Sequence, residues 1–286
     1  MGGPPGPSLN RRALWAFIVV VLAGCGSSSN GGSHPARAGS HAATPAPNAP
    51  NGEASKAPAQ IIQDAVAALD RVHSFHLQGY QSGSGPPTYL NADIAIPGRL
   101  RVTLSQGRGI AQIIAINGQG YLRANLAFYS GRTGANPRVA ALLANRWISE
   151  PATTTPGASI FDALTSAATV GHCLVASHNG RLSVTGTSSI GGRPVVVVTD
   201  HGGPPGTAPG RLYVTTTGPP LPLLGLQTSA GRPGGTPDRE CNETASDVST
   251  HSTSGRFAIS AYNRPVSISA PAGALDLSTL SPGTQV

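Results

Sequence analysis

Between residues 74 and 269 the chain consists largely of short segments in which apolar and polar residues alternate, separated by Gly, Pro and Asn. Alternation with a period of two predicts strands that bury one side and expose the other. Asn117-Gly118 and Gly191-Gly192 lie between such segments and are typical of tight hairpin turns. We expect about ten strands, drawn from residues 74–80, 89–96, 99–105, 110–116, 119–123, 147–148, 181–189, 193–199, 211–217, 221–228, 254–261 and 265–269.

Three segments have helical spacing instead. Residues 60–73 place apolar side chains on one stripe, with Pro58 at the expected first turn and Ser55 as a possible cap. Two shorter segments, 136–145 and 159–169, interrupt the run of strands, and 270–277 suggests a terminal helical turn. The pattern predicts an α+β fold. It would be one large curved antiparallel sheet with an N-terminal helix and two short central helices on its concave face.

The N-terminus has the form of an export signal. Arg11-Arg12 precede an apolar run from Ala13 to Ala23, which is about half the ~20 residues needed to span a membrane. The run ends in Leu22-Ala23-Gly24-Cys25, which resembles the bacterial lipobox, where the cysteine is diacylated and becomes the mature N-terminus. We therefore expect residues 1–24 to be a signal peptide. Cys25 would carry the lipid anchor on the extracytoplasmic side of the cell membrane.

Composition divides the remainder. Residues 25–58 are rich in Ser, Gly, Ala and Pro with almost no large apolar side chains, which predicts a disordered tether. Residues 59–286 form the expected domain. The formal net charge is +7, but no run of basic residues suggests a nucleic-acid site. Lys56 is the sole lysine, and heavy use of Arg, Ala, Gly and Pro is typical of a GC-rich genome such as that of an actinobacterium.

Two cysteines remain after Cys25. In an oxidising compartment, Cys173 and Cys241 favour a disulfide that closes a loop of 69 residues. The alternative is two unrelated buried thiols. His172 and His178 do not complete a zinc spacing, so no metal site and no cofactor are expected.

Several segments resemble the LppX/LprG-type lipoproteins of actinobacteria, whose fold is related to the LolA and LolB transport proteins. They are residues 72–77, 118–122 with Trp147-Ile148, 210–214 with 218–223, and 262–268 with Ala270-Pro271. The resemblance implies a half-barrel whose hydrophobic cavity binds acyl chains of glycolipids or lipoproteins and helps move them from the membrane. It does not carry over the cysteine pair.

No catalytic motif is present: the chain lacks Gly-x-Ser-x-Gly, His-Glu-x-x-His and a phosphate loop. Asp200-His201 would need a nucleophile that the sequence does not identify, and His73 and His76 are a weak metal pair. We therefore expect a protein that is not an enzyme.

The apolar strand and helix faces either pack as a solid core or line a lipid cavity. The candidate cavity residues are Leu69, Val102, Leu104, Ile114, Ile116, Val139, Leu142, Phe161, Leu164, Val184, Val196, Val198 and Val214. A cavity of several hundred Å³ would favour a lipid carrier. A filled core would favour the alternative, a non-catalytic envelope sensor or scaffold that binds another protein.

Overall fold

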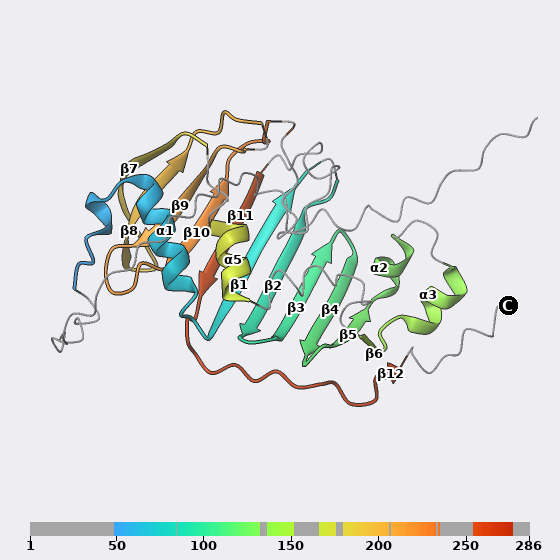
Figure 1. Ribbon diagram of the computed structural model, residues 1–286. Helices are drawn as coiled ribbons and strands as arrows, with labels where there is room; N and C mark the ends of the chain where they lie inside the picture. The colour runs from blue at the N-terminus through green and yellow to red at the C-terminus, as the bar shows by residue number, and fades with distance from the viewer. Residues whose placement is uncertain are drawn as a thin grey trace, which may run out of the picture.

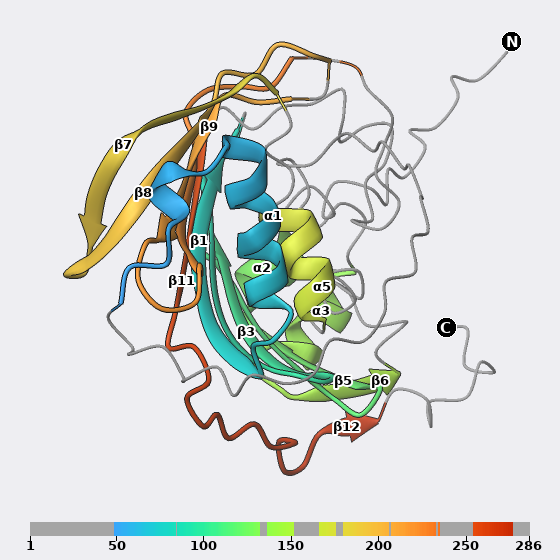
Figure 2. The ribbon, with the colours of Figure 1, turned by 60° about the vertical axis from the view of Figure 1, so that its left-hand side comes forward.

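The computed structural model describes residues 49–83, 85–131, 136–151, 166–175, 180–205, 207–232, 234 and 254–276. Twelve strands form one sheet in the order β12-β6-β5-β4-β3-β2-β1-β11-β10-β9-β8-β7, antiparallel except for the parallel pair β12–β6. The sheet curves around the helices α1 and α5 without closing into a barrel (Figures 1 and 2). The predicted α+β fold, a large curved sheet with helices in its hollow, is confirmed.

The first half of the sheet is a meander. Its strands are β1 (Ser74–Ser82), β2 (Thr88–Ala95), β3 (Arg99–Gln106), β4 (Gly109–Ile116), β5 (Gln119–Ala124) and β6 (Ile148–Pro151). The second half consists of β7 (Leu182–Ile190), β8 (Arg193–Asp200), β9 (Gly210–Thr215), β10 (Pro222–Gln227) and β11 (Ser254–Ser260), with β12 (Leu275–Asp276) at the far edge. Pairing of β1 with β11 joins the two halves.

Turn chemistry explains two of the hairpins. Asn117 and Gly118 between β4 and β5 both have positive φ, at 52° and 78°, as do Gly191 and Gly192 between β7 and β8. This is the conformation of a type I′ turn, which Asn and Gly adopt with little strain. Both predicted hairpins are confirmed.

The helical elements are η1 (Glu53–Ser55), α1 (Pro58–Leu69), α2 (Leu126–Ser130), α3 (Pro137–Leu143), α5 (Ala167–Val170) and the π-helical turn η2 (Gly171–Val175). Pro58 is in the first turn of α1 as predicted, but the N-cap position is occupied by Ala57 and not by the predicted Ser55. The Asn136 side chain caps α3 by accepting from the backbone N–H of Arg138 at 2.9 Å. The predicted strand at 265–269 is wrong, because residues 265–271 have no regular structure. The predicted helical turn at 270–277 is wrong over its described residues, which form a turn at 272–273 and then β12.

The described fold starts before α1. Asn51 donates through its side chain to the carbonyls of Thr215 and Gly218, and Glu53 is buried beside Lys56. These residues belong to the segment that the sequence analysis assigned to the tether.

Alternation along the strands gives the sheet two faces. The concave face carries the main core, in which Phe75, Ile113 and Leu212 are fully buried in one cluster with residues of α1 and η2. The convex face has a small apolar cluster at one end, where Ile268 of the C-terminal segment packs on Ala95 and Ile114. The core therefore lies in the hollow of the sheet.

Candidate functional site

Helices fill the middle of the concave face. Ile61, Ala65 and Leu69 of α1 share one buried stripe, three to four residues apart, and pack into the same cluster as Leu174 and Val175 of η2. Side chains from β1 to β5 and from β8 and β9 complete this cluster. This part of the hollow is a packed core.

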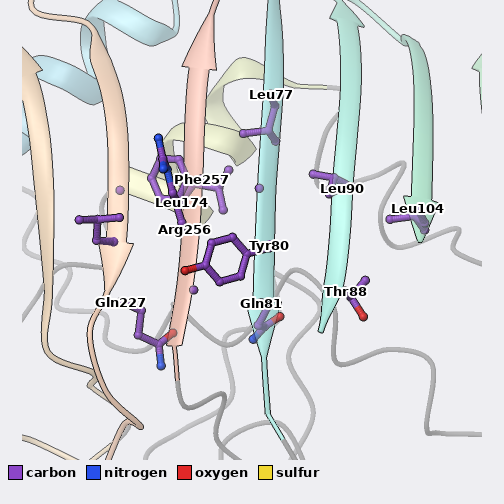
Figure 3. A pocket seen from close by; sticks show the side chains of 14 residues that line it. Leu77, Tyr80, Gln81, Thr88, Leu90, Leu104, Leu174, Gln227, Arg256 and Phe257 are labelled. Carbon is purple, nitrogen blue, oxygen red and sulfur yellow. The ribbon is translucent and has the colours of Figure 1, made fainter. Parts of the chain in front are cut away.

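A second part of the hollow, where β1, β2, β3, β10 and β11 meet, is not filled by the described residues. A cavity of about 80 Å³ lies there between the sheet and Leu174 (Figure 3). Its wall is apolar: Leu77 comes from β1, Leu90 from β2, Leu104 from β3 and Phe257 from β11. We refer to it as the concave pocket.

Glycines on neighbouring strands create this space. Gly79, Gly225 and Gly255 all occupy inward positions, because Phe257 pairs with both Gly79 and Gly225, and Gly255 pairs with Gln81 and Gln227. The ring of Phe257 lies so close over Gly225 that a Cβ there would be 2.1 Å from Cε1. The glycines lower the pocket floor, and Gly225 lets the aromatic ring lie flat against the sheet.

Polar groups occupy one end of the pocket. Gln81, Thr88 and Gln227 line it, and Thr88 is 6% exposed with its Oγ1 buried and without a hydrogen-bond partner in the structure. Tyr80 and Arg256 border the pocket through their backbone, because strand alternation directs their side chains to the other face. Among the described residues, no ionisable side chain points into the pocket, so it suits an uncharged apolar group.

Six of the residues predicted to line a cavity share the concave core. They are Leu69, Val102, Leu104, Val196, Val198 and Val214. Among the predicted residues that the structure describes, Leu104 is the one that lines the concave pocket. The others in this group are covered by packed neighbours.

The remaining candidates lie elsewhere. Ile114 and Ile116 belong to the convex cluster with Ile268. Val139 and Leu142 on α3 and Val184 on β7 are exposed. Phe161 and Leu164 lie outside the described residues.

Most of the pocket wall is absent from the predicted cavity residues. Leu77 and Phe257 looked like ordinary inward strand residues, and Leu174 is on a π-helical turn that periodicity does not reveal. A signal was present, because glycine interrupts the inward positions of β1, β10 and β11. These glycines can be recognised as one group only when the pairing of β1, β10 and β11 is known.

The predicted lipidation site Cys25 and the predicted disulfide partner Cys241 lie outside the described residues. Cys173 is buried on η2, the turn that covers the concave face. Both the lipid anchor and the Cys173–Cys241 bond remain predictions.

Asp200-His201 acquires a hydroxyl partner in the fold. Ser183 Oγ on β7 is 2.8 Å from Nε2 of His201, the residue that follows β8. The buried Asp200 carboxylate instead accepts from the backbone N–H groups of Gly180 and Gly202, at 3.0 and 2.6 Å. It thus fixes a loop, and this trio does not have the arrangement of a catalytic triad.

Within the described ranges, no group of three or more His, Cys, Asp or Glu side chains could hold a metal ion. Searched over the same residues, the helices include none that is both long and apolar enough to cross a membrane.

No family model matches this sequence, and no curated protein matches it. Among solved structures, LprF from Mycobacterium bovis is similar at 16% identity and a TM-score of 0.46, covering 78% of this chain and 99% of that one. The Mycobacterium tuberculosis lipoprotein LppX is similar at 12% identity and a TM-score of 0.42, covering 74% and 98%. MucB in complex with MucA follows at 14% identity and a TM-score of 0.35, covering 76% and 60%.

LppX belongs to the group that the sequence resemblance named, and the curved, open sheet agrees with that resemblance. At these identities and TM-scores the likeness concerns the fold and not the function.

Proposed function

We propose that the chain is an exported, non-catalytic lipoprotein that binds an acyl chain of a lipid, glycolipid or lipoprotein in the concave pocket. Cys25 anchors it to the extracytoplasmic side of the cell membrane, and it carries the bound chain within the envelope. The observation that supports this is the concave pocket itself, a hollow with four leucines and Phe257 in its wall and glycines in its floor.

The driving force for binding is the transfer of hydrocarbon out of water. Each methylene buried in such a site contributes about 0.8 kcal/mol. A pocket of about 80 Å³ accepts one end of a chain, with the remainder following the sheet toward its open side. Gln81, Thr88 and Gln227 lie where the apolar wall ends, so they suit the polar group at which an acyl chain begins.

The packed middle of the concave face supports a second candidate, the envelope sensor or scaffold. A typical small-molecule pocket has about 300–1,000 Å³, which exceeds the volume found here. A scaffold would bind its partner protein without any lipid in the fold.

A larger side chain that fills the concave pocket distinguishes a lipid-binding protein from a scaffold. Leu90 on β2 is half-buried on the pocket wall, so Leu90→Trp extends an indole ring into the hollow. Ile110→Trp adds the same ring at an exposed position of β4 and serves as the matched control. Binding of a fluorescent fatty acid is measured by titration of the full chain carrying Cys25→Ala, with native mass spectrometry to detect co-purified lipid.

If Leu90→Trp excludes two or three methylenes, the affinity for the probe falls by roughly 15- to 60-fold. Ile110→Trp leaves it unchanged. Absence of both co-purified lipid and probe uptake in the parent chain refutes lipid binding and favours the scaffold. Equal binding by parent and Leu90→Trp moves the site away from the concave pocket.

A further inference from the structure

The outer face of the sheet carries a second hollow with different chemistry. It has a volume of about 380 Å³ and extends over β11, β1, β2 and β3. The side chains that line it from the outer face are Gln78, Tyr80, Tyr89, Asn91, Thr103, Ser105, Arg256 and Ala258. We refer to it as the outer groove.

Strand register places these side chains in two rows across the sheet. Arg256, Tyr80, Tyr89 and Ser105 are successive cross-strand partners, and so are Ala258, Gln78, Asn91 and Thr103. Three strand spacings of about 4.8 Å make the groove roughly 14 Å wide. It therefore fits an extended oligomer that crosses the strands.

Two tyrosines form an exposed aromatic platform. Tyr80 and Tyr89 are 38% and 52% exposed, with ring centroids 6.0 Å apart and ring planes inclined by 42°. Figure 3 shows Tyr80 projecting from β1 on the side of the sheet away from α5. Exposed tyrosines on a polar background suit a ligand with weakly apolar C–H faces and hydrogen-bonding edges.

Polar side chains in both rows offer hydrogen bonds in both directions. In the second row the amides of Gln78 and Asn91 and the hydroxyl of Thr103 each donate and accept, and in the first row the hydroxyl of Ser105 does the same. Hydroxyls around a sugar ring also donate and accept. A lipid tail or an apolar protein surface would leave these groups unpaired.

Most of the charged side chains on the outer face are positive. Arg99, Arg101, Arg123, Arg211 and Arg256 occupy outward positions and are exposed. On the outward positions of the described strands β1 to β5 and β8 to β11, the one carboxylate is Asp93, held by Arg101 at 2.6 Å and by His76 at 2.8 Å. Arg256 at the edge of the groove has no such partner among the described residues, so it suits a carboxylate or phosphate on the ligand.

We propose that the outer groove binds a glycan chain bearing anionic groups. Sugar rings stack on Tyr80 and Tyr89, their hydroxyls pair with Gln78, Asn91, Thr103 and Ser105, and an acidic substituent binds Arg256. The site is independent of the concave pocket, because alternate residues of the same strands face opposite sides. An exported lipoprotein with such a face would hold an anionic envelope polysaccharide while its hollow faces away from it.

Calorimetric titration of the full chain tests this with three probes: an oligogalacturonate, neutral maltohexaose and poly-glutamate of matched charge. We expect binding of oligogalacturonate, weaker binding of maltohexaose and none of poly-glutamate. Tyr80→Ala and Tyr89→Ala each weaken oligogalacturonate binding about tenfold, since each removes one stacking surface. Arg256→Gln weakens it and lowers its salt dependence.

Arg123→Gln is the matched control, because it removes an arginine from the same face outside the groove. It changes the affinity by less than about twofold. Equal binding of poly-glutamate would contradict the proposal, and so would tyrosine variants that bind as the parent does. Either result would mean that the outer face attracts polyanions in general. Equal binding of maltohexaose refutes the anionic requirement, and no binding of either sugar refutes the proposal.

Discussion

Over β1, β2 and β3, the concave and outer faces are built from the same strands, yet their chemistry is mostly opposite. On β1 the inward residues Phe75 and Leu77 are buried under helices, whereas the outward Gln78 and Tyr80 face solvent. The inner face is apolar, and among the described residues side chains of α1, α2 and η2 pack into its core, with the concave pocket between the sheet and Leu174. Over β1, β2 and β3 the outer face is mostly polar and carries exposed arginines, whereas outward residues such as Ile114 on β4 and Val195 on β8 are buried. A period of two thus lets one sheet carry two unrelated surfaces.

The largest expected difference between the two faces is in the stability lost when an aromatic ring is removed. Phe75→Ala removes a fully buried ring from the concave core and should lower the free energy of unfolding by about 3–5 kcal/mol. Tyr89→Ala removes an exposed ring from the neighbouring strand and should cost about 1 kcal/mol or less. Urea unfolding of both variants measures the difference. Similar losses would mean that the outer face contributes to the core.

A smaller loss of stability is expected when a glycine in the floor of the concave pocket gains a methyl group. Gly225→Ala places a Cβ 2.1 Å from Cε1 of Phe257, so the ring must move and stability should fall by about 1–3 kcal/mol. Thermal unfolding should show partial recovery in Gly225→Ala with Phe257→Leu, because the shorter side chain relieves the contact.

Gly83→Ala is the control, since no atom lies within 4 Å of its added Cβ. It should change stability by no more than about 0.5 kcal/mol. Additive effects of the two pocket substitutions would show that Phe257 does not lie over Gly225 in solution.

The smallest expected change in stability is that caused by replacing Asp93, the carboxylate on the outer face. Burial raises the pKa of Asp93, but hydrogen bonds from Arg101 and His76 outweigh it and hold the pKa below its ordinary value. A lowered pKa means that the stabilisation is present above the unfolded-state pKa and disappears as pH falls through the folded-state pKa. Asp93→Asn should therefore cost about 1 kcal/mol or less at neutral pH.

That difference should vanish on acidification to about pH 3 or below, as urea unfolding at several pH values would show. An Asp93→Asn effect that is constant with pH would assign the loss to shape and not to charge.

Local patterns in the sequence specified much of the sheet. Alternation in 99–105 and 110–116 predicted β3 and β4, and Asn117-Gly118 predicted their connection to β5, because these signals act between near neighbours. The C-terminal segment misled the same reasoning. Val266 and Ile268 look like strand residues, but they pack on the outer cluster without pairing, and pairing begins at Leu275.

By itself the sequence determined an α+β fold with one large sheet, its two tight hairpins and the apolar and polar sides of strands such as β1 and β3, whereas β8 and β10 are buried on both sides. The tertiary structure decided which apolar residues enclose a pocket and which are packed. Leu104 and Val102 are both inward on β3, but Leu104 reaches the pocket and Val102 lies in the core. That distinction depends on where η2 ends and on glycines from three strands that are distant in sequence but adjacent in the sheet, so no local pattern contains it.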